Sequence, residues 1–65
     1  MSLDYRVIPQ VERLAKQYTQ MCEENSDKAK DFYKSFIGQI ERRCAFWYAC
    51  PNPHIEYFQK LVEGR

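Results

Sequence analysis

Residues 26–50 read SDKAKDFYKSFIGQIERRCAFWYAC, and this stretch decides the fold. Its apolar residues recur at spacings of three and four, which places them along one broad stripe of a helix. The charged residues fall mostly on the opposite side, as a face turned to solvent requires. The stretch therefore predicts one long amphipathic helix over about residues 27–49. The stripe consists of Ala29, Phe32, Tyr33, Phe36, Ile37, Ile40, Cys44, Trp47 and Tyr48.

Both ends of this helix carry sequence signals. Asn25 or Ser26 can cap its start, because a side-chain oxygen there accepts a hydrogen bond from an amide that lacks a partner within the helix. Pro51 disfavours helical geometry at Cys50 and cannot donate a backbone hydrogen bond. The helix should therefore end near Ala49 or Cys50.

Gly38 interrupts the middle of the predicted helix, where a glycine costs about 1 kcal/mol relative to alanine. Two interpretations fit this residue: it is a tolerated defect, or its missing side chain lets another helix approach closely.

A first helix is expected before this stretch, over about residues 9–23, with Pro9 at the first helical position that proline favours. Residues 23–27 contain no apolar side chain and read as a short connection, which forces the two helices into an antiparallel hairpin. The first helix has a heptad-like apolar seam of Val7, Val11, Leu14, Tyr18 and Met21.

A third, shorter helix is expected after the stretch, over about residues 53–63. Pro51, Asn52 and Pro53 form a rigid corner, in which Asn52 can cap the helix and Pro53 can occupy its first position.

The predicted fold class is all-α: an antiparallel hairpin of two long helices plus a short third C-terminal helix, in one domain over residues 1–65 that assembles into a dimeric helical bundle. The expected core positions are Val11, Leu14, Tyr18, Met21, Phe32, Phe36, Ile40, Ile55 and Phe58.

Composition limits the function further. Ten basic and nine acidic residues leave a net charge of +1, so no overall field draws the chain toward nucleic acid or an anionic membrane. No apolar run reaches the roughly 20 residues needed to span a bilayer. Three cysteines cannot all pair with one another, and reduced thiols are typical of the cytoplasm. We therefore expect a cytoplasmic protein without a membrane partner.

The leading hypothesis is a non-catalytic interaction or regulatory module that acts as a homo-oligomer, in contact with a protein partner that the sequence does not identify. Three helices this short carry more apolar surface than one copy covers, and a large exposed apolar patch usually marks an interface. The expected interface residues are Phe46, Trp47 and Tyr48, together with Tyr33 and Ile37.

Nucleic-acid binding is the first alternative. Arginines beside aromatic side chains can combine phosphate contacts with base stacking. The candidate residues are Arg42, Arg43, Lys30 and Lys34, although the balanced net charge and the adjoining Glu41 weaken this alternative.

A zinc-stabilised domain is the second alternative, since cysteine and histidine suit tetrahedral zinc. The candidate ligands are Cys44, Cys50, His54 and the distant Cys22. On an ideal helix, positions 44 and 50 lie about 240° apart, so these two side chains diverge. We therefore expect neither a metal nor another cofactor.

Catalysis is not expected either. Cys50 and His54 could act as nucleophile and base, but no third group nearby in the sequence orients them. We expect His54 to lie in the first turn of the third helix, partly exposed. The sequence also has no glycine-rich phosphate loop and no paired-carboxylate motif.

Overall fold

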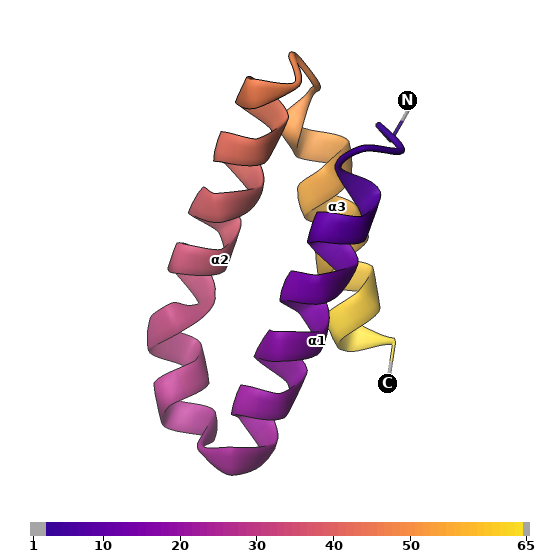
Figure 1. The fold of residues 1–65 in the computed structure, drawn as a ribbon. Helices are drawn as coiled ribbons and strands as arrows, with labels where there is room; N and C mark the ends of the chain where they lie inside the picture. Colours follow the sequence, from indigo (N-terminus) through magenta and orange to yellow (C-terminus); the bar gives the residue numbers. More distant parts are fainter. Residues whose placement is uncertain (1–2, 65) are drawn as a thin grey trace.

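The computed structural model describes residues 3–64. It contains the helices α1 (Ile8–Glu24), α2 (Ser26–Phe46) and α3 (Pro51–Glu63), shown in Figure 1. No strand occurs in residues 3–64, so the prediction of an all-helical chain with three helices is confirmed. Residues 1, 2 and 65, which the predicted domain includes, lie outside the described residues.

The three helices enclose a common interior. Figure 1 shows α1 and α2 side by side with opposite directions, while α3 turns back from the far end of α2 and lies along α1. Each helix contacts both of the others. This arrangement turns the three apolar stripes of the sequence toward one another.

The connection between α1 and α2 is a single residue. Asn25 is extended (φ −160°, ψ 100°), and its amide still donates to the Met21 carbonyl at the end of α1. Its side-chain Oδ1 accepts from the Lys28 amide at 3.1 Å. Asn25 therefore ends one helix and caps the next, which confirms the first of the two predicted caps and shortens the expected connection.

The buried core agrees with most of the predicted positions. Phe32 is a correction, because it is 42% exposed on α2. Phe32 lies at the edge of the apolar stripe of α2, where α1 and α3 leave it partly uncovered. Tyr18, Met21 and Ile55 pack partly buried against the core. The fully or almost fully buried side chains are Val7, Val11, Leu14, Ala15, Ala29, Phe36, Ile40, Cys44, His54 and Phe58.

Four aromatic rings, which we name the central ring cluster, join the three helices in the core. They are Tyr18 from α1, Tyr33 and Phe36 from α2, and Phe58 from α3. Tyr18 lies 5.4 Å from Tyr33 and 6.0 Å from Phe58 between ring centroids. These separations lie in the range in which aromatic pairs attract one another beyond their burial.

Helix α3 begins at Pro51 rather than at Pro53. Cys50, the residue before the proline, is extended (φ −75°, ψ 127°) and takes the cap position, as steric clash with a following proline favours. Pro51 then occupies the first helical position. The prediction that Asn52 caps this helix is therefore wrong, because Asn52 lies inside it.

Gly38 does not let another helix of this chain approach. Among residues 3–64, apart from its two chain neighbours and its own helical backbone, no atom lies within 4 Å of the position that a Cβ would occupy. The close-approach interpretation is therefore wrong for contacts within the chain.

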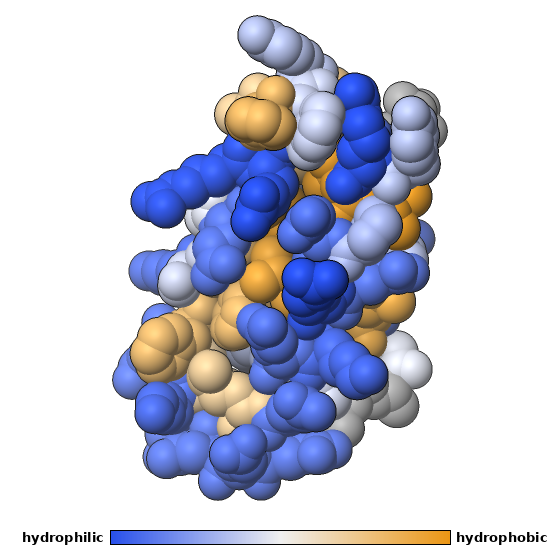
Figure 2. All heavy atoms as spheres, in the orientation of Figure 1, coloured by the Kyte–Doolittle hydropathy of each residue, from blue (hydrophilic) through white to orange (hydrophobic). Residues whose placement is uncertain are grey.

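On the surface, apolar side chains form separate islands among hydrophilic ones on the face drawn in Figure 2. Within residues 3–64, no helix combines the length and apolar content that crossing a bilayer requires.

Candidate functional site: the aromatic corner

The chain reverses direction between α2 and α3 through a pair of backbone hydrogen bonds. The Tyr48 amide donates to the Ala45 carbonyl at 3.2 Å, and the Ala49 amide donates to the Cys44 carbonyl at 2.7 Å. These two bonds form the Schellman motif, which ends a helix by satisfying its last carbonyls. Helix α2 therefore ends at Phe46, and its predicted extension to residue 49 is wrong.

Tyr48 occupies the position of this motif that glycine usually fills. Its φ is 56°, in the left-handed region, where a side chain costs about 1–2 kcal/mol because Cβ crowds the following carbonyl. The side chain is also 97% exposed. Tyr48 thus has an unfavourable backbone conformation and gains almost no packing within the chain.

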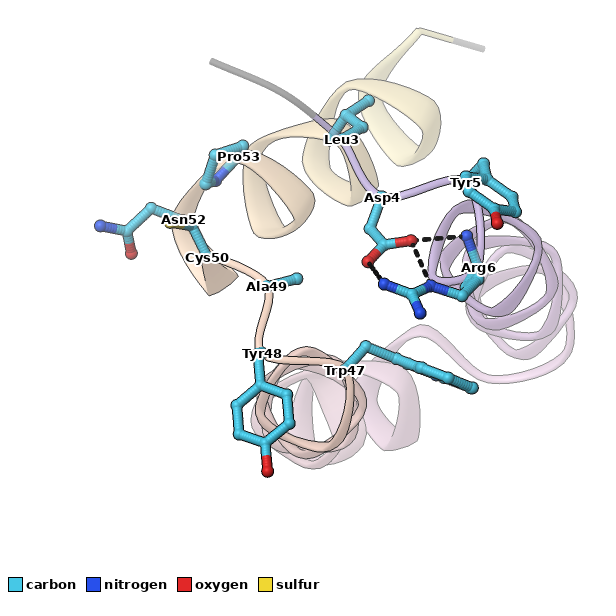
Figure 3. Close-up of a pocket in the computed structure, with 10 residues that line it drawn as sticks. All are labelled: Leu3, Asp4, Tyr5, Arg6, Trp47, Tyr48, Ala49, Cys50, Asn52 and Pro53. Carbon is cyan, nitrogen blue, oxygen red and sulfur yellow. Dashed lines mark hydrogen bonds and ion pairs between the residues drawn. The ribbon is translucent and has the colours of Figure 1, made fainter.

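We name Phe46, Trp47 and Tyr48 the aromatic corner. Phe46 is 70% exposed, and its ring meets the Trp47 ring edge to face at 4.9 Å. Trp47 is half-buried and packs against the core. The side chains of Trp47 and Tyr48 point away from one another (Figure 3). Two of the three rings in the corner are therefore open to solvent.

The N-terminal segment covers Trp47. The guanidinium carbon of Arg6 lies 4.5 Å from the centroid of the Trp47 ring and 5.8 Å from that of Tyr5. Arg6 also binds Asp4 through two hydrogen bonds, Nη2 to Oδ2 at 2.9 Å and Nε to Oδ1 at 3.1 Å. Figure 3 shows this pair above Trp47. The hydrogen bonds from the Arg6 side chain and amide lower the pKa of Asp4.

His54 fastens the same segment to α3. The Asp4 amide donates to His54 Nε2 at 2.9 Å, and His54 Nδ1 lies 2.7 Å from the Cys50 carbonyl oxygen. The side chain is fully buried, so the expectation that it is partly exposed is wrong. Folding of residues 3–6 over the start of α3 covers the ring, which a pattern confined to α3 does not show.

A cleft of about 820 Å³ lies between the N-terminal segment and the turn from α2 to α3. The Asp4–Arg6 pair and Trp47 form one side, and residues 48–50 with Asn52 and Pro53 form the other (Figure 3). The sequence interpretation missed Asp4 and Arg6 here. Their only signal was opposite charge two residues apart, which is common on ordinary surfaces. The lining residues are Leu3, Asp4, Tyr5, Arg6, Trp47, Tyr48, Ala49, Cys50, Asn52 and Pro53.

The two remaining predicted interface residues lie apart from the corner. Tyr33 and Ile37 pack partly buried against the core, and both line a groove of about 410 Å³ with Ile55 and Gln59 of α3. The Tyr33 hydroxyl accepts a hydrogen bond from Gln59 Nε2 at 3.1 Å. The structure thus places these two side chains at the contact between α2 and α3.

The four predicted nucleic-acid contacts do not share one groove. Arg42 and Arg43 line a shallow groove of about 480 Å³ beside Phe46, whereas Lys34 lines the groove between α2 and α3. Lys30 is exposed. Within residues 3–64, neither arginine forms an ion pair.

The predicted zinc ligands are not brought together. Among residues 3–64, no three histidine, cysteine or acidic side chains are placed to hold a metal ion. Cys44 is buried and Cys50 is exposed, while Cys22 is half-buried in the last turn of α1. Burial raises the pKa of the Cys44 thiol, with smaller contributions from Asp4 and Cys50.

Cys50 and His54 do not form a nucleophile–base pair. His54 Nδ1 faces the Cys50 backbone carbonyl rather than its thiol, and Nε2 faces the Asp4 amide. No ring nitrogen is left to accept a proton from a thiol.

Comparisons with protein-family models, with curated proteins and with solved structures each give no match.

Proposed function

We propose that the chain is a small, non-catalytic protein-interaction or regulatory module that acts as a homo-oligomer through the aromatic corner. The observation that carries the proposal is Tyr48, a bulky residue with a left-handed backbone and a side chain that is 97% exposed. A glycine at this position would form the same turn without strain. The aromatic side chain therefore needs a role outside the isolated chain.

The neighbourhood of Tyr48 supports an interface. Phe46 is 70% exposed, and aromatic side chains are the most frequent anchors of protein–protein contacts. Full burial of one such side chain contributes about 1.5–3 kcal/mol. Two newly buried rings in each copy would thus contribute a substantial part of a dimerisation energy.

A second copy is the partner that suits this surface best. The three side chains of the aromatic corner are uncharged, so a two-fold contact centred on them buries no charge of the corner; Arg42 and Arg43 beside Phe46 would lie at its rim, exposed to solvent. Rings from the two copies could meet in the offset or edge-on geometry that aromatic pairs favour.

Light scattering over a range of protein concentrations tests the proposal. We expect wild type to be a dimer or larger, and Phe46→Ser to shift the equilibrium toward monomer. Phe32→Ser is the matched control, because Phe32 is an exposed phenylalanine of the same helix that lies outside the corner. A monomeric wild type, or an equal effect of both variants, contradicts the proposal.

Tyr48→Gly separates stability from association. Removing the left-handed strain should raise the Tm and add about 1 kcal/mol to the free energy of unfolding of the monomer, while the loss of the ring weakens the dimer. A substitution that merely damaged the fold would lower both the stability of the monomer and the strength of the dimer. Trp47→Ala is less informative, because Trp47 also packs against the core.

Nucleic-acid binding remains a second candidate, because Arg42 and Arg43 have no ion-pair partner in residues 3–64 and lie beside Phe46. Binding through them would weaken as salt increases and would be lost in the Arg42→Ala, Arg43→Ala double variant. Titration of a labelled oligonucleotide at two salt concentrations measures this. Absence of binding at low salt would exclude it.

A further inference from the structure

The protonation state of His54 follows from its two hydrogen bonds. A backbone amide can only donate, so Nε2 must accept from Asp4, and a carbonyl can only accept, so Nδ1 must carry the proton toward Cys50. The buried ring is therefore neutral in this structure. The bond to Asp4 joins positions that are 50 residues apart in the sequence.

This hydrogen bond holds the segment that covers Trp47. Asp4 binds His54 through its amide and Arg6 through its carboxylate, while Arg6 lies over the Trp47 ring. One continuous series of contacts thus runs from a titratable ring to the half-buried member of the aromatic corner.

We propose that residues 3–6 are a cover that His54 holds closed while neutral and releases when protonated, so that Trp47 becomes available to the interface. The link to an interface rests on the proposed function, whereas the opening of the cover does not.

The chemistry of opening requires one proton from solvent. A proton on Nε2 replaces an acceptor with a donor, which then faces the Asp4 amide donor and breaks that hydrogen bond. The imidazolium also attracts the Asp4 carboxylate, so it competes with Arg6 for that carboxylate and weakens the Asp4–Arg6 pair that lies over Trp47. The nearby titratable groups are Asp4, Tyr5 and Arg6 in the segment, Cys50 just after the corner, and Cys44 of α2, which interacts electrostatically with Asp4 and Cys50.

The charge of Asp4 is retained during this competition. Its hydrogen bonds with Arg6 lower its pKa below the ordinary value of 3.8, whereas histidines ordinarily change charge between about pH 8 and pH 5. The carboxylate is therefore negative throughout that pH range.

Acrylamide quenching of fluorescence measures the exposure of Trp47 directly, because it is the only tryptophan in the chain. At protein concentrations low enough to keep the chain monomeric, we expect the quenching constant to rise and the emission maximum to shift to the red between about pH 8 and pH 5. Far-UV circular dichroism should stay unchanged over this range. Flat quenching, or a rise that accompanies loss of helix, would overturn the proposal.

Variants isolate each contact. Arg6→Ala should leave Trp47 quenched strongly at both pH values, and His54→Gln should remove the pH dependence. Because His54→Gln could weaken the core, Asp4→Pro and Asp4→Ala form a second, matched pair. Both lack the carboxylate, but only proline lacks the amide that binds Nε2. In Asp4→Pro we expect the cover over Trp47 to be open at both pH values, whereas in Asp4→Ala we expect the quenching of Trp47 to keep its pH dependence. Identical quenching in the two variants would overturn the proposal that His54 holds the cover closed through the Asp4 amide.

Light scattering at the same two pH values then separates the two proposals. Stronger association at low pH, together with a rise in quenching, supports the coupling. Association that is equal at both pH values overturns the coupling and leaves the proposed function in place. A chain that stays monomeric while quenching still rises contradicts the proposed function but supports the release of the cover by His54.

Discussion

The central ring cluster and the aromatic corner contain the same kinds of side chain in very different surroundings. In the cluster, Tyr18, Tyr33, Phe36 and Phe58 come from three helices, and their rings lie between 5.4 and 6.3 Å apart. In the corner, the only ring pair is Phe46 with Trp47, which are adjacent in the sequence. The cluster stabilises this chain, while most of the corner faces solvent.

The difference shows that position relative to the helix ends decides what an aromatic residue does. In the middle of α2, helices α1 and α3 both pack against the apolar stripe and cover it. Past Phe46, the Schellman turn reverses the chain before α3 begins at Pro51. Arg6 of the N-terminal segment lies over the Trp47 ring, whereas Phe46 and Tyr48 stay 70% and 97% exposed.

Truncating one ring in each region gives the largest expected contrast. Phe58→Ala should reduce the free energy of unfolding by about 3–5 kcal/mol, because Phe58 is fully buried among the other rings. Phe46→Ala should change the monomer by less than about 0.5 kcal/mol. Urea denaturation at low protein concentration measures both. Similar losses in the free energy of unfolding for the two variants would contradict the difference between the ring cluster and the corner.

Thiol labelling tests the boundary between the regions. Cys44 is buried just before the corner, and Cys50 is exposed just after it. Burial raises the pKa of Cys44, which further reduces the reactive thiolate. We expect Cys44 to react at least about a thousandfold more slowly than Cys50, because its reaction requires unfolding. Mass spectrometry of alkylated peptides measures the ratio, and urea should abolish the difference.

Gly38→Ala tests whether the glycine in the middle of α2, between the two regions, is needed for stability or for association. Nothing lies within 4 Å of an added Cβ, so the monomer should gain about 1 kcal/mol in stability from the higher helix propensity of alanine. Thermal denaturation measures the gain. If the variant is more stable but associates less, a partner helix contacts this face of α2 as well as the corner.

Acid titration should give the smallest effect, through the Asp4–Arg6 pair. The pKa of Asp4 is lower in the folded chain than its ordinary value of 3.8. The stabilisation by this pair is therefore complete above that value and is lost as the pH falls through the lower folded pKa. Wild type should lose Tm slightly more than Asp4→Asn below about pH 3.8. Equal losses of Tm would show that the pair contributes nothing to the stability of the fold.

Local patterns predicted the helices well. The three-and-four spacing from Ala29 to Cys44 identified the buried stripe of α2, and Asn25 was recognised as a cap because capping needs only residues within one turn. The sequence predicts the end of α2 near residue 49, whereas the helix ends at Phe46. Pro51 explains why Cys50 is extended, but it does not show how the chain reverses before Cys50. The reversal depends on Tyr48 adopting a left-handed conformation, which its residue type does not favour.

The candidate site was predicted only in part. The run from Phe46 to Tyr48 was identified as apolar excess, and the structure leaves Phe46 and Tyr48 exposed. The sequence also predicts Tyr33 at the interface, because a stripe on one helix does not show which part a third helix covers. The prediction that Phe32 lies in the core is wrong for the same reason.

The sequence by itself determined three amphipathic helices, the cap at Asn25 and a set of apolar stripes, since these depend on residues within a few positions of one another. Only the tertiary structure decided that His54 is buried and that Trp47 is covered while Phe46 and Tyr48 are not. Those outcomes depend on Asp4 and Arg6, whose contacts with the far end of the chain form only when the three helices pack together. Burial is a property of what surrounds a side chain, and here the surroundings come from more than forty positions away.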